Sequence, residues 1–324
     1  MLRSVEAVTI LTLQDNYINI TAADNSATVT RARKLLGGAR GPSISAEHGF
    51  SAIITTTAEN RERSLLFDFG TSPHGAADNA RRLGLGPGMI EIMALSHGHY
   101  DHFEGFEALV ALLGGPGVPL VVHPAVFRNP RYFKDPSGKK YALPAFSRDR
   151  VKKTGVEIVE SSVPKTMLGE TALFLGEIER TTDFEKGMPG AFYEQDGEER
   201  RDCLEDDTAV VMHLRNKGLV VISGCAHAGI INTIRYARKV TGIDKIHVVM
   251  GGFHLTGPAD DPVLRSTVDA LKTIGPDYAA PCHCCSREAV MLVEREMPER
   301  FLFNMSGTKF SFRSTDAGDP PQSV

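Results

Sequence analysis

Apolar residues recur along this 324-residue chain with two different periods, and each period predicts a different kind of element. Short apolar runs bounded by turn residues predict strands, whereas apolar positions three to four residues apart predict helices. Strands are expected at 8–13, 50–56, 64–67, 90–95, 120–122, 156–160, 172–175, 208–214, 219–223, 245–250, 278–281, 301–303 and 309–312. Helices are expected at 75–83, 104–113, 229–240, 261–274 and 287–297, and residues 26–36 form either a helix or an ordered loop.

The order of these elements predicts an α/β fold. Hairpins come first, and strands then alternate with helices in both halves, which two mixed sheets with helices on their outer faces would satisfy. Segments 124–153 and 177–206 show no clear period, so they are expected to be long loops inserted into a single domain spanning residues 1–313. The polar residues 314–324 are expected to form a disordered tail.

Composition narrows the possible partners and the compartment. Hydrophobic residues make up 42% of the chain, which is enough for a large core, and the formal charge of -4 gives no basic surplus for nucleic acid. No apolar run approaches the roughly 18 residues of a membrane helix, so no membrane association is expected. Five cysteines, three of them within 282–285, are a poor disulfide framework and favour a reducing, cytoplasmic environment.

The strongest chemical signal is the segment 95–102, Leu-Ser-His-Gly-His-Tyr-Asp-His, between an expected strand and an expected helix. If the backbone stays extended, His97, His99 and Asp101 point the same way. The turn into the helix then brings His102 beside Asp101. Neutral imidazole and carboxylate are ligands that zinc, iron and manganese accept. A solvated polar turn needs no histidines, so the segment predicts a metal site.

This segment resembles the His-x-His-x-Asp-His signature of the metallo-β-lactamase superfamily. The resemblance implies a four-layer αββα sandwich of two mixed sheets, and two divalent metal ions, with zinc favoured over iron or manganese. It implies that His97 and His99 hold one metal while Asp101 and His102 hold the other. By the same resemblance Asp68, at the end of a strand, orients the metal loop from behind the ligands. The alternative for Asp68 is a plain turn aspartate before glycine.

Further motifs resemble one branch of that superfamily. Its members are commonly named after 7,8-dihydropterin-6-methyl-4-(β-D-ribofuranosyl)aminobenzene 5'-phosphate synthase. The motifs lie at 47–51, 96–105, 223–230, 251–255 and 281–284. They follow the same order as in the branch, and the resemblance runs from about residue 8 to residue 312.

Two later histidines complete the expected ligand set. His227 and His283 each follow an apolar strand, where an α/β sheet presents functional groups. By the resemblance, His227 joins the first metal and His283 joins the second. The alternative for each is a histidine that caps a helix or makes a core hydrogen bond.

The chain departs from the wider superfamily at two positions. Many members have a metal-binding histidine before the strand expected at 208–214, where this chain has Glu205, Asp206 and Asp207. Many also have a bridging aspartate after the next strand, where this chain has Cys225. The bridge is therefore open between a Cys225 thiolate, Asp207 and a hydroxide alone. Otherwise Cys225 is a small packed residue and Asp207 a turn carboxylate.

Other residues are candidates for a substrate pocket. His254 follows the strand expected at 245–250, and it serves either in acid–base catalysis or as part of the pocket wall. His48 is a further pocket candidate. The basic and aromatic loop at 128–140 includes Arg128, Arg131 and Tyr132. It forms either a lid for an anionic, ring-containing ligand or solvated surface.

Together these features predict an enzyme. The expected function is a dinuclear-metal-dependent hydrolase, in which a metal-bound hydroxide attacks a phosphoester or related ester of a small, pterin-like or anionic molecule. Asp101 is expected to guide the proton of the nucleophile as well as to hold metal. The alternatives are an iron-dependent oxidoreductase or sulfur dioxygenase, and a ligand-binding or sensing protein with vestigial activity. The expected partner is a small-molecule substrate, and no pattern indicates an oligomeric state.

Overall fold

The computed structural model describes residues 2–38, 43–115 and 117–314. An eight-stranded sheet, built mostly from the N-terminal half, has the order β10-β7-β6-β5-β4-β2-β19-β3. Its strands are β2 (Ala7–Gln14), β3 (Val29–Thr30), β4 (Ser51–Ala58), β5 (Arg61–Phe67), β6 (Ile92–Ala94), β7 (Leu120–Val122), β10 (Ile158–Glu160) and β19 (Lys309–Arg313). Strand β19 pairs antiparallel with β2, so the last described strand completes the sheet begun by one of the first.

A seven-stranded sheet belongs mostly to the C-terminal half. Its order is β11-β12-β15-β16-β17-β18, with β1 paired to β15. Its strands are β1 (Ser4–Val5), β11 (Lys165–Met167), β12 (Ala172–Phe174), β15 (Ala209–Leu214), β16 (Gly218–Ser223), β17 (Ile246–Gly252) and β18 (Tyr278–Cys282). Every residue of β16 and β17 is buried, as expected for central parallel strands that are covered on both faces.

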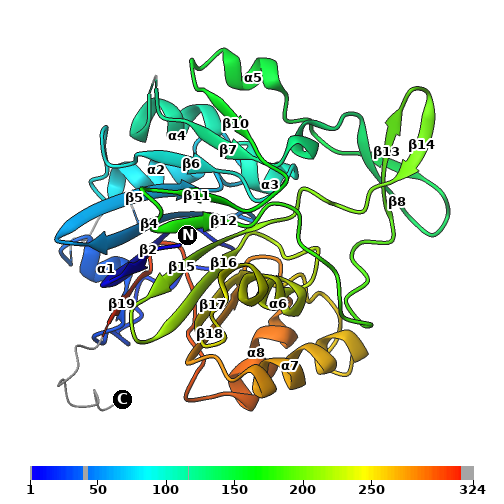
Figure 1. Cartoon of the computed structure of the whole chain (residues 1–324). Helices are drawn as coiled ribbons and strands as arrows, with labels where there is room; N and C mark the ends of the chain where they lie inside the picture. The colour runs from blue at the N-terminus through cyan, green and yellow to red at the C-terminus, as the bar shows by residue number, and fades with distance from the viewer. Residues whose placement is uncertain (1, 39–42, 116, 315–324) are drawn as a thin grey trace.

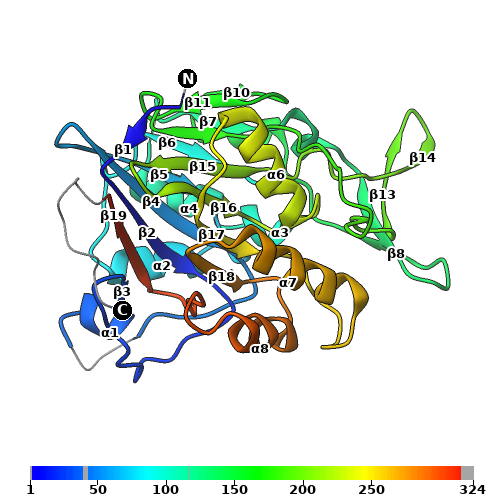
Figure 2. The same ribbon diagram turned by 60° about the horizontal axis from the view of Figure 1, so that its bottom comes forward.

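Helices cover the outer faces of both sheets. The helices α2 (Gly75–Arg82) and α4 (Phe106–Leu113) share one apolar cluster with the eight-stranded sheet. The helices α6 (Ile230–Thr241), α7 (Pro262–Ile274) and α8 (Arg287–Glu296) share another with the seven-stranded sheet. A third apolar cluster lies between the two sheets. These four layers, visible in Figures 1 and 2, confirm the expected αββα sandwich.

The parallel strands explain where functional side chains gather. Strands β5, β6 and β7 run parallel in one sheet, and β16, β17 and β18 run parallel in the other. Loops after the carboxyl ends of parallel strands lie along one edge of a sheet. The segments that follow these strands carry Asp68, residues 95–102, Cys225, His227, His254 and His283. The loops of the two sheets meet, because His102 lies against His283 and His97 lies against His227.

A third, four-stranded sheet is not predicted by the sequence pattern. Its order is β14-β13-β8-β9, with strands β8 (Arg131–Lys134), β9 (Lys140–Ala142), β13 (Ala191–Gln195) and β14 (Glu198–Arg201). In Figure 1 its strands β8, β13 and β14 project from the right of the sandwich. All four strands come from the segments 124–153 and 177–206, which were expected to be loops. The same segments contain the short helices η1 (Pro124–Phe127) and α5 (Arg148–Lys152). The pairing of β8 with β13 joins residues far apart in the sequence, so no local period signals it.

Smaller differences occur at the ends of the chain. Residues 26–36 contain β3 and the short helix α1 (Ala32–Leu35) in place of one helix. Within 301–303, Phe301 forms only an isolated bridge with Ala279. The expected tail at 314–324 lies outside the described residues apart from Ser314. None of the helices in the described part of the chain has the length and apolar character that a membrane crossing needs.

Candidate metal centre

The segment after β6 supplies the first four candidate ligands. His99 keeps an extended backbone, with φ -94° and ψ 146°, and the short helix α3 (Tyr100–Phe103) starts at the next residue. This change of backbone conformation places Asp101 and His102 on the helix, while His97 and His99 precede it. The four side chains are buried.

His97 and His99 form one group with His227, which follows β16. One ligand atom from each of the three side chains lies within 4.8 Å of those of the other two. The Nε2 atoms of His97 and His227 are 3.2 Å apart. The structure therefore brings together the three side chains that were expected to hold the first metal.

Asp101 and His102 form a second group with His283, which follows β18, and with Cys225. The Nε2 atoms of His102 and His283 are 3.1 Å apart, and His283 Nε2 is 3.3 Å from Asp101 Oδ2. The two groups adjoin, since the rings of His97 and His102 have centroids 4.3 Å apart.

These separations fit bound metal ions. In a tetrahedral zinc site with metal–nitrogen bonds of about 2.0–2.1 Å, two ligand nitrogens lie about 3.3 Å apart. The pairs His97–His227 and His102–His283 match that spacing, and imidazole with carboxylate is a donor set that zinc, iron and manganese accept. The residues present therefore fit two divalent cations.

The protonation of the first group favours metal binding. Burial lowers the pKa of His97 and His227 well below the ordinary value, and it lowers the pKa of His99 to about 4. Burial alone would raise the pKa of Asp101, but the adjacent His102 and His283 hold it well below its ordinary value. Near neutral pH the three histidines of the first group are therefore neutral imidazoles and Asp101 is a carboxylate, which are the forms that ligate metals. Burial lowers the pKa of His102, but Asp68 and Asp101 raise it to about 9, so metal binding at the second group would release a proton from His102.

Asp68 lies directly behind the second group. Its Oδ2 is 2.7 Å from His102 Nδ1, and the backbone N–H of Ser96 donates to its Oδ1 at 2.7 Å. The Ser96 hydroxyl donates to Asp68 Oδ2 at 2.7 Å as well. A carboxylate on Nδ1 fixes the tautomer in which the lone pair of Nε2 faces the metal. Asp68 thus connects the start of the metal loop to one of its ligands.

Replacing Asp68 with asparagine is expected to weaken metal affinity or turnover by roughly 10- to 100-fold. The amide keeps the size of the side chain but removes the charge that orients His102. Metal titration of the purified variant, with circular dichroism as a check on folding, measures the effect. Asp78→Asn on α2 serves as the control, because Asp78 is half-exposed and pairs only locally with Arg81. Wild-type affinity and turnover in Asp68→Asn would show that Asp68 does not act through His102.

The metal loop is also held from a second side, by Asp206. Its Oδ2 accepts the Gly98 backbone N–H at 2.8 Å, and both of its oxygens accept from Arg131, at 2.8 and 2.9 Å. Gly98 has to be glycine here, because a Cβ would lie 2.4 Å from Arg131 Nη1 and 2.6 Å from the Val126 carbonyl oxygen. Asp202 pairs with Arg131 Nε at 2.8 Å.

The three residues of the 128–140 loop that were proposed for a substrate pocket have different positions in the structure. Arg131 is buried and engaged by Asp202 and Asp206, so it braces the metal loop and is not presented to a ligand. Arg128 pairs with Glu205 and lies over the ring of Tyr193. Of the three residues named from that loop, Tyr132 lines the cavity above the metal groups.

Asp207 lies beside the ligand loops without entering either group. Its Oδ2 accepts the Ala228 backbone N–H at 2.8 Å, next to His227, and burial raises its pKa to about 7. It lines a different cavity, whose walls include Arg180 and Tyr236. Asp207 is thus placed to support the His227 loop, and this position does not suit a bridge between the metals.

Cys225 and the two remaining histidines lie at the cavity. Cys225 Sγ is 3.2 Å from His102 Nε2 and belongs to the second group. His254 packs its ring against His227, with centroids 4.3 Å apart. His48 stacks on His283 and has its Nε2 3.6 Å from Asp101 Oδ2.

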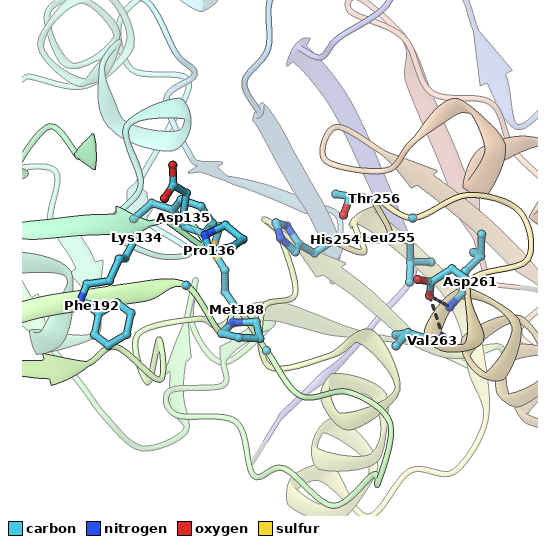
Figure 3. A pocket seen from close by; sticks show the side chains of 16 residues that line it. Lys134, Asp135, Pro136, Met188, Phe192, His254, Leu255, Thr256, Asp261 and Val263 are labelled. Atoms are coloured by element: carbon cyan, nitrogen blue, oxygen red, sulfur yellow. Dashed lines mark hydrogen bonds between the residues drawn. The ribbon is translucent and has the colours of Figure 1, made fainter. Parts of the chain in front are cut away.

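Two neighbouring cavities share lining residues beside the metal groups. The inner cavity, of about 170 Å³, is lined by His48, His99, Tyr100, Asp101, Tyr132, Phe133, Leu143, Met188, Ala191, Cys225, His227, His254 and Cys284. The outer cavity, of about 680 Å³, shares Phe133, Met188 and His254 with it. In Figure 3, His254 lies in the middle of the outer cavity, between Lys134 and Phe192 on one side and Val263 on the other.

Comparison with known proteins agrees with this geometry. The model of the metallo-β-lactamase superfamily matches residues 48–283, which is more than half of the chain. The chain belongs to the metallo-β-lactamase superfamily. Membership in this superfamily implies divalent-metal binding, and it confirms the resemblance drawn from the motif at 97–102.

Two relatives within the superfamily come from Methanocaldococcus jannaschii. The first is 7,8-dihydropterin-6-methyl-4-(β-D-ribofuranosyl)-aminobenzene-5'-phosphate synthase, 30% identical over 288 residues that cover 88% of this chain and 96% of that protein. The second is the uncharacterized protein MJ0448, 31% identical over 252 residues that cover 76% of this chain and 86% of that protein. The similarity to the synthase confirms the resemblance to that branch.

A solved structure of the superfamily shows the same fold. Tm1679, described as a metal-dependent hydrolase of the β-lactamase superfamily, superposes with a TM-score of 0.71 at 24% sequence identity. The match covers 95% of this chain and 100% of that one.

The structure thus brings together the six side chains that the sequence proposed as ligands. They are His97, His99, Asp101, His102, His227 and His283. The sequence did not identify two residues that lie beside the metal groups. Asp206 accepts the Gly98 backbone N–H, and Cys284 lines the inner cavity. The carboxylate run at 205–207 and the cysteine cluster at 282–285 were visible signals, but neither shows which member faces the site.

Proposed function

We propose that this chain is a dinuclear-metal-dependent hydrolase that cleaves a phosphoester or related ester of a small anionic molecule. The observation that carries the proposal is the pair of adjoining ligand groups beneath an inner cavity of about 170 Å³, which shares lining residues with an outer cavity of about 680 Å³. The donor set favours zinc, with iron and manganese also accommodated. Two divalent cations about 3.5–4 Å apart lower the pKa of bound water and stabilise negative charge on an attacked oxygen.

His254 is the side chain best placed for proton transfer. It lines both cavities, and its buried Nδ1 has no hydrogen-bond partner among the described residues. A ring nitrogen in that position can donate to, or accept from, a substrate oxygen that enters the inner cavity. Asp101 has the complementary role, because its ionised carboxylate can both hold metal and accept a hydrogen bond from the nucleophile. His48, more than half exposed beside Asp101, is placed to contact the substrate.

The outer cavity suits a ring-containing group. Phe133, Phe192, Met188 and Leu255 give it apolar walls, and Lys134 adds a basic group that pairs with Glu199. Apolar walls with a few polar groups are typical of small-molecule sites. The name of the Methanocaldococcus jannaschii synthase describes a product with aromatic rings and a phosphate ester, which supports a ring-containing, phosphorylated ligand for the cavity of this chain.

The cysteines support a reducing compartment for this activity. All five are within the described residues, and all are free thiols. Because three of them lie within residues 282–285, and thiols so close in sequence persist under reducing conditions, we propose that the protein is cytoplasmic.

The purified protein, reconstituted with zinc, manganese or iron(II), is expected to hydrolyse phosphoesters and to act weakly on β-lactams. A panel of phosphomonoesters, phosphodiesters, lactones and β-lactams tests this class. Activity should disappear with a chelator and return with added metal, because the ligand groups supply the reaction centre. Oxygen consumption with a thiol substrate, combined with no hydrolysis across the panel, would replace the proposal with an iron-dependent oxidoreductase.

A further inference from the structure

The sulfur of Cys225 lies close to ligands of both metal groups. Its Sγ is grouped with Asp101, His102 and His283 on one side, with all ligand atoms within 4.8 Å of one another. The same sulfur is grouped with His227 and His254 on the other side. One atom therefore lies within reach of both the second metal position and a ligand of the first.

The surroundings of the sulfur are those of a ligand. In a tetrahedral site with a metal–sulfur bond of about 2.3 Å and a metal–nitrogen bond of about 2.0–2.1 Å, the two donors lie about 3.6 Å apart. Cys225 Sγ is 3.2 Å from His102 Nε2, close to that spacing. Since Asp68 takes the Nδ1 side of His102, its Nε2 and the sulfur face the same space. A cysteine that serves only to fill volume has no need to face a ring nitrogen and a carboxylate.

We propose that Cys225 is a thiolate ligand shared by the two metal ions, a role that rests on the hydrolase proposed above. Binding replaces the thiol S–H bond with sulfur–metal bonds, the proton leaves to solvent, and no electron is transferred. A sulfur donor favours zinc or iron over magnesium and calcium, so the bridge would also narrow the choice of metal.

Cys284 supports this arrangement from the far side of the sulfur. The Cys284 thiol donates to the Cys225 carbonyl oxygen, with Sγ 3.6 Å from that oxygen. Cys284 Sγ accepts the His254 backbone N–H at 3.2 Å. Gly252 leaves room for this contact, because a Cβ there would lie 2.6 Å from Cys284 Sγ. Cys284 is not in any of the metal-binding groups found among the described residues, so it is a positioning residue for Cys225.

Cobalt spectroscopy tests the assignment without relying on activity. The wild type and the variants Cys225→Ala, Cys225→Asp, Cys284→Ser and Cys203→Ser are loaded with cobalt(II), and bound cobalt is counted for each. Wild type should bind close to two cobalt ions with a strong sulfur-to-cobalt charge-transfer band. The band should vanish in Cys225→Ala. It should also vanish in Cys225→Asp, which can keep both ions through a carboxylate. It should persist in Cys284→Ser and in Cys203→Ser, whose cysteine is exposed.

Each other outcome overturns the assignment in a recognisable way. Two bound cobalt ions without a sulfur band in wild type would contradict the thiolate ligand while leaving the hydrolase intact. A band lost in Cys284→Ser and kept in Cys225→Ala would assign the sulfur to Cys284. Failure of the wild type to bind cobalt would remove both the bridge and the proposed hydrolase. If Cys225→Ala does not fold, Cys225→Asp decides between these results.

Discussion

Alanine at both His97 and His99 is expected to empty the first metal position and to reduce turnover to background. The two substitutions remove two of the three imidazoles in that group and leave His227 as its only remaining histidine, beside the shared thiolate proposed for Cys225. A single imidazole cannot hold a divalent cation against water, so about half of the bound metal should be lost. Metal analysis of the purified double variant, together with hydrolysis assays, measures both effects.

The control for this variant is His213→Ala. His213 lies on β15 and belongs to neither ligand group, so its loss should leave metal content and turnover unchanged. Metal content in the double variant equal to that of wild type would show that this group does not bind the ion.

Replacing Arg131 with leucine is expected to destabilise the fold by about 3–5 kcal/mol, the range for breaking a buried ion pair by removing one partner. Arg131 is buried, and it faces Asp202 and Asp206, which are also buried. Its loss leaves Asp206 without a counter-charge, leaves Asp202 only its longer pair with Arg128 at 3.5 Å, and frees the Gly98 turn of the metal loop. Urea unfolding in the presence of a chelator measures the effect, because bound metal would otherwise add to the stability of the native state.

Arg128→Leu is the matched control for that measurement. Arg128 pairs with Glu205 and, at the longer distance of 3.5 Å, with Asp202, but Arg128 and Glu205 are each about one-third exposed, so the expected loss is only about 0–1 kcal/mol. Equal destabilisation by the two substitutions would contradict the account of Arg131 as the brace of the metal loop. Lower metal affinity in Arg131→Leu, but not in Arg128→Leu, is expected as a second consequence.

The parts of this protein that the sequence predicts are those encoded by neighbouring residues. The segment 95–102 holds four ligands within one strand–helix turn, so their spacing alone indicates a metal site. The apolar strands β16 and β17 and the helix α6 have periods that can be recognised without any tertiary contact. His227 and His283 were located because each follows such a strand.

The features that the sequence does not predict are those formed by residues far apart in the chain. The third sheet depends on β8 pairing with β13, across some sixty residues, and its strands are rich in charged side chains. Arg131 resembles a surface residue in the sequence, because its carboxylate partners lie more than 70 positions later.

The sequence also does not show which of Asp206 and Asp207 contacts the metal loop. Residues 205–206 lie in a turn before β15, and the local path of the backbone in that turn decides which carboxylate meets Gly98. The sequence shows the carboxylates but not their direction. The same holds for Cys225, whose contact with His102 depends on two loops from different sheets.

The central claim is that the two groups of side chains bind two metal ions, and the direct test is the metal content of the wild-type protein. Protein purified without chelator is analysed by inductively coupled plasma mass spectrometry, before and after reconstitution with zinc, iron(II) or manganese. The account predicts close to two transition-metal ions per chain. A ratio below one that does not rise on reconstitution with any of the three metals would contradict it.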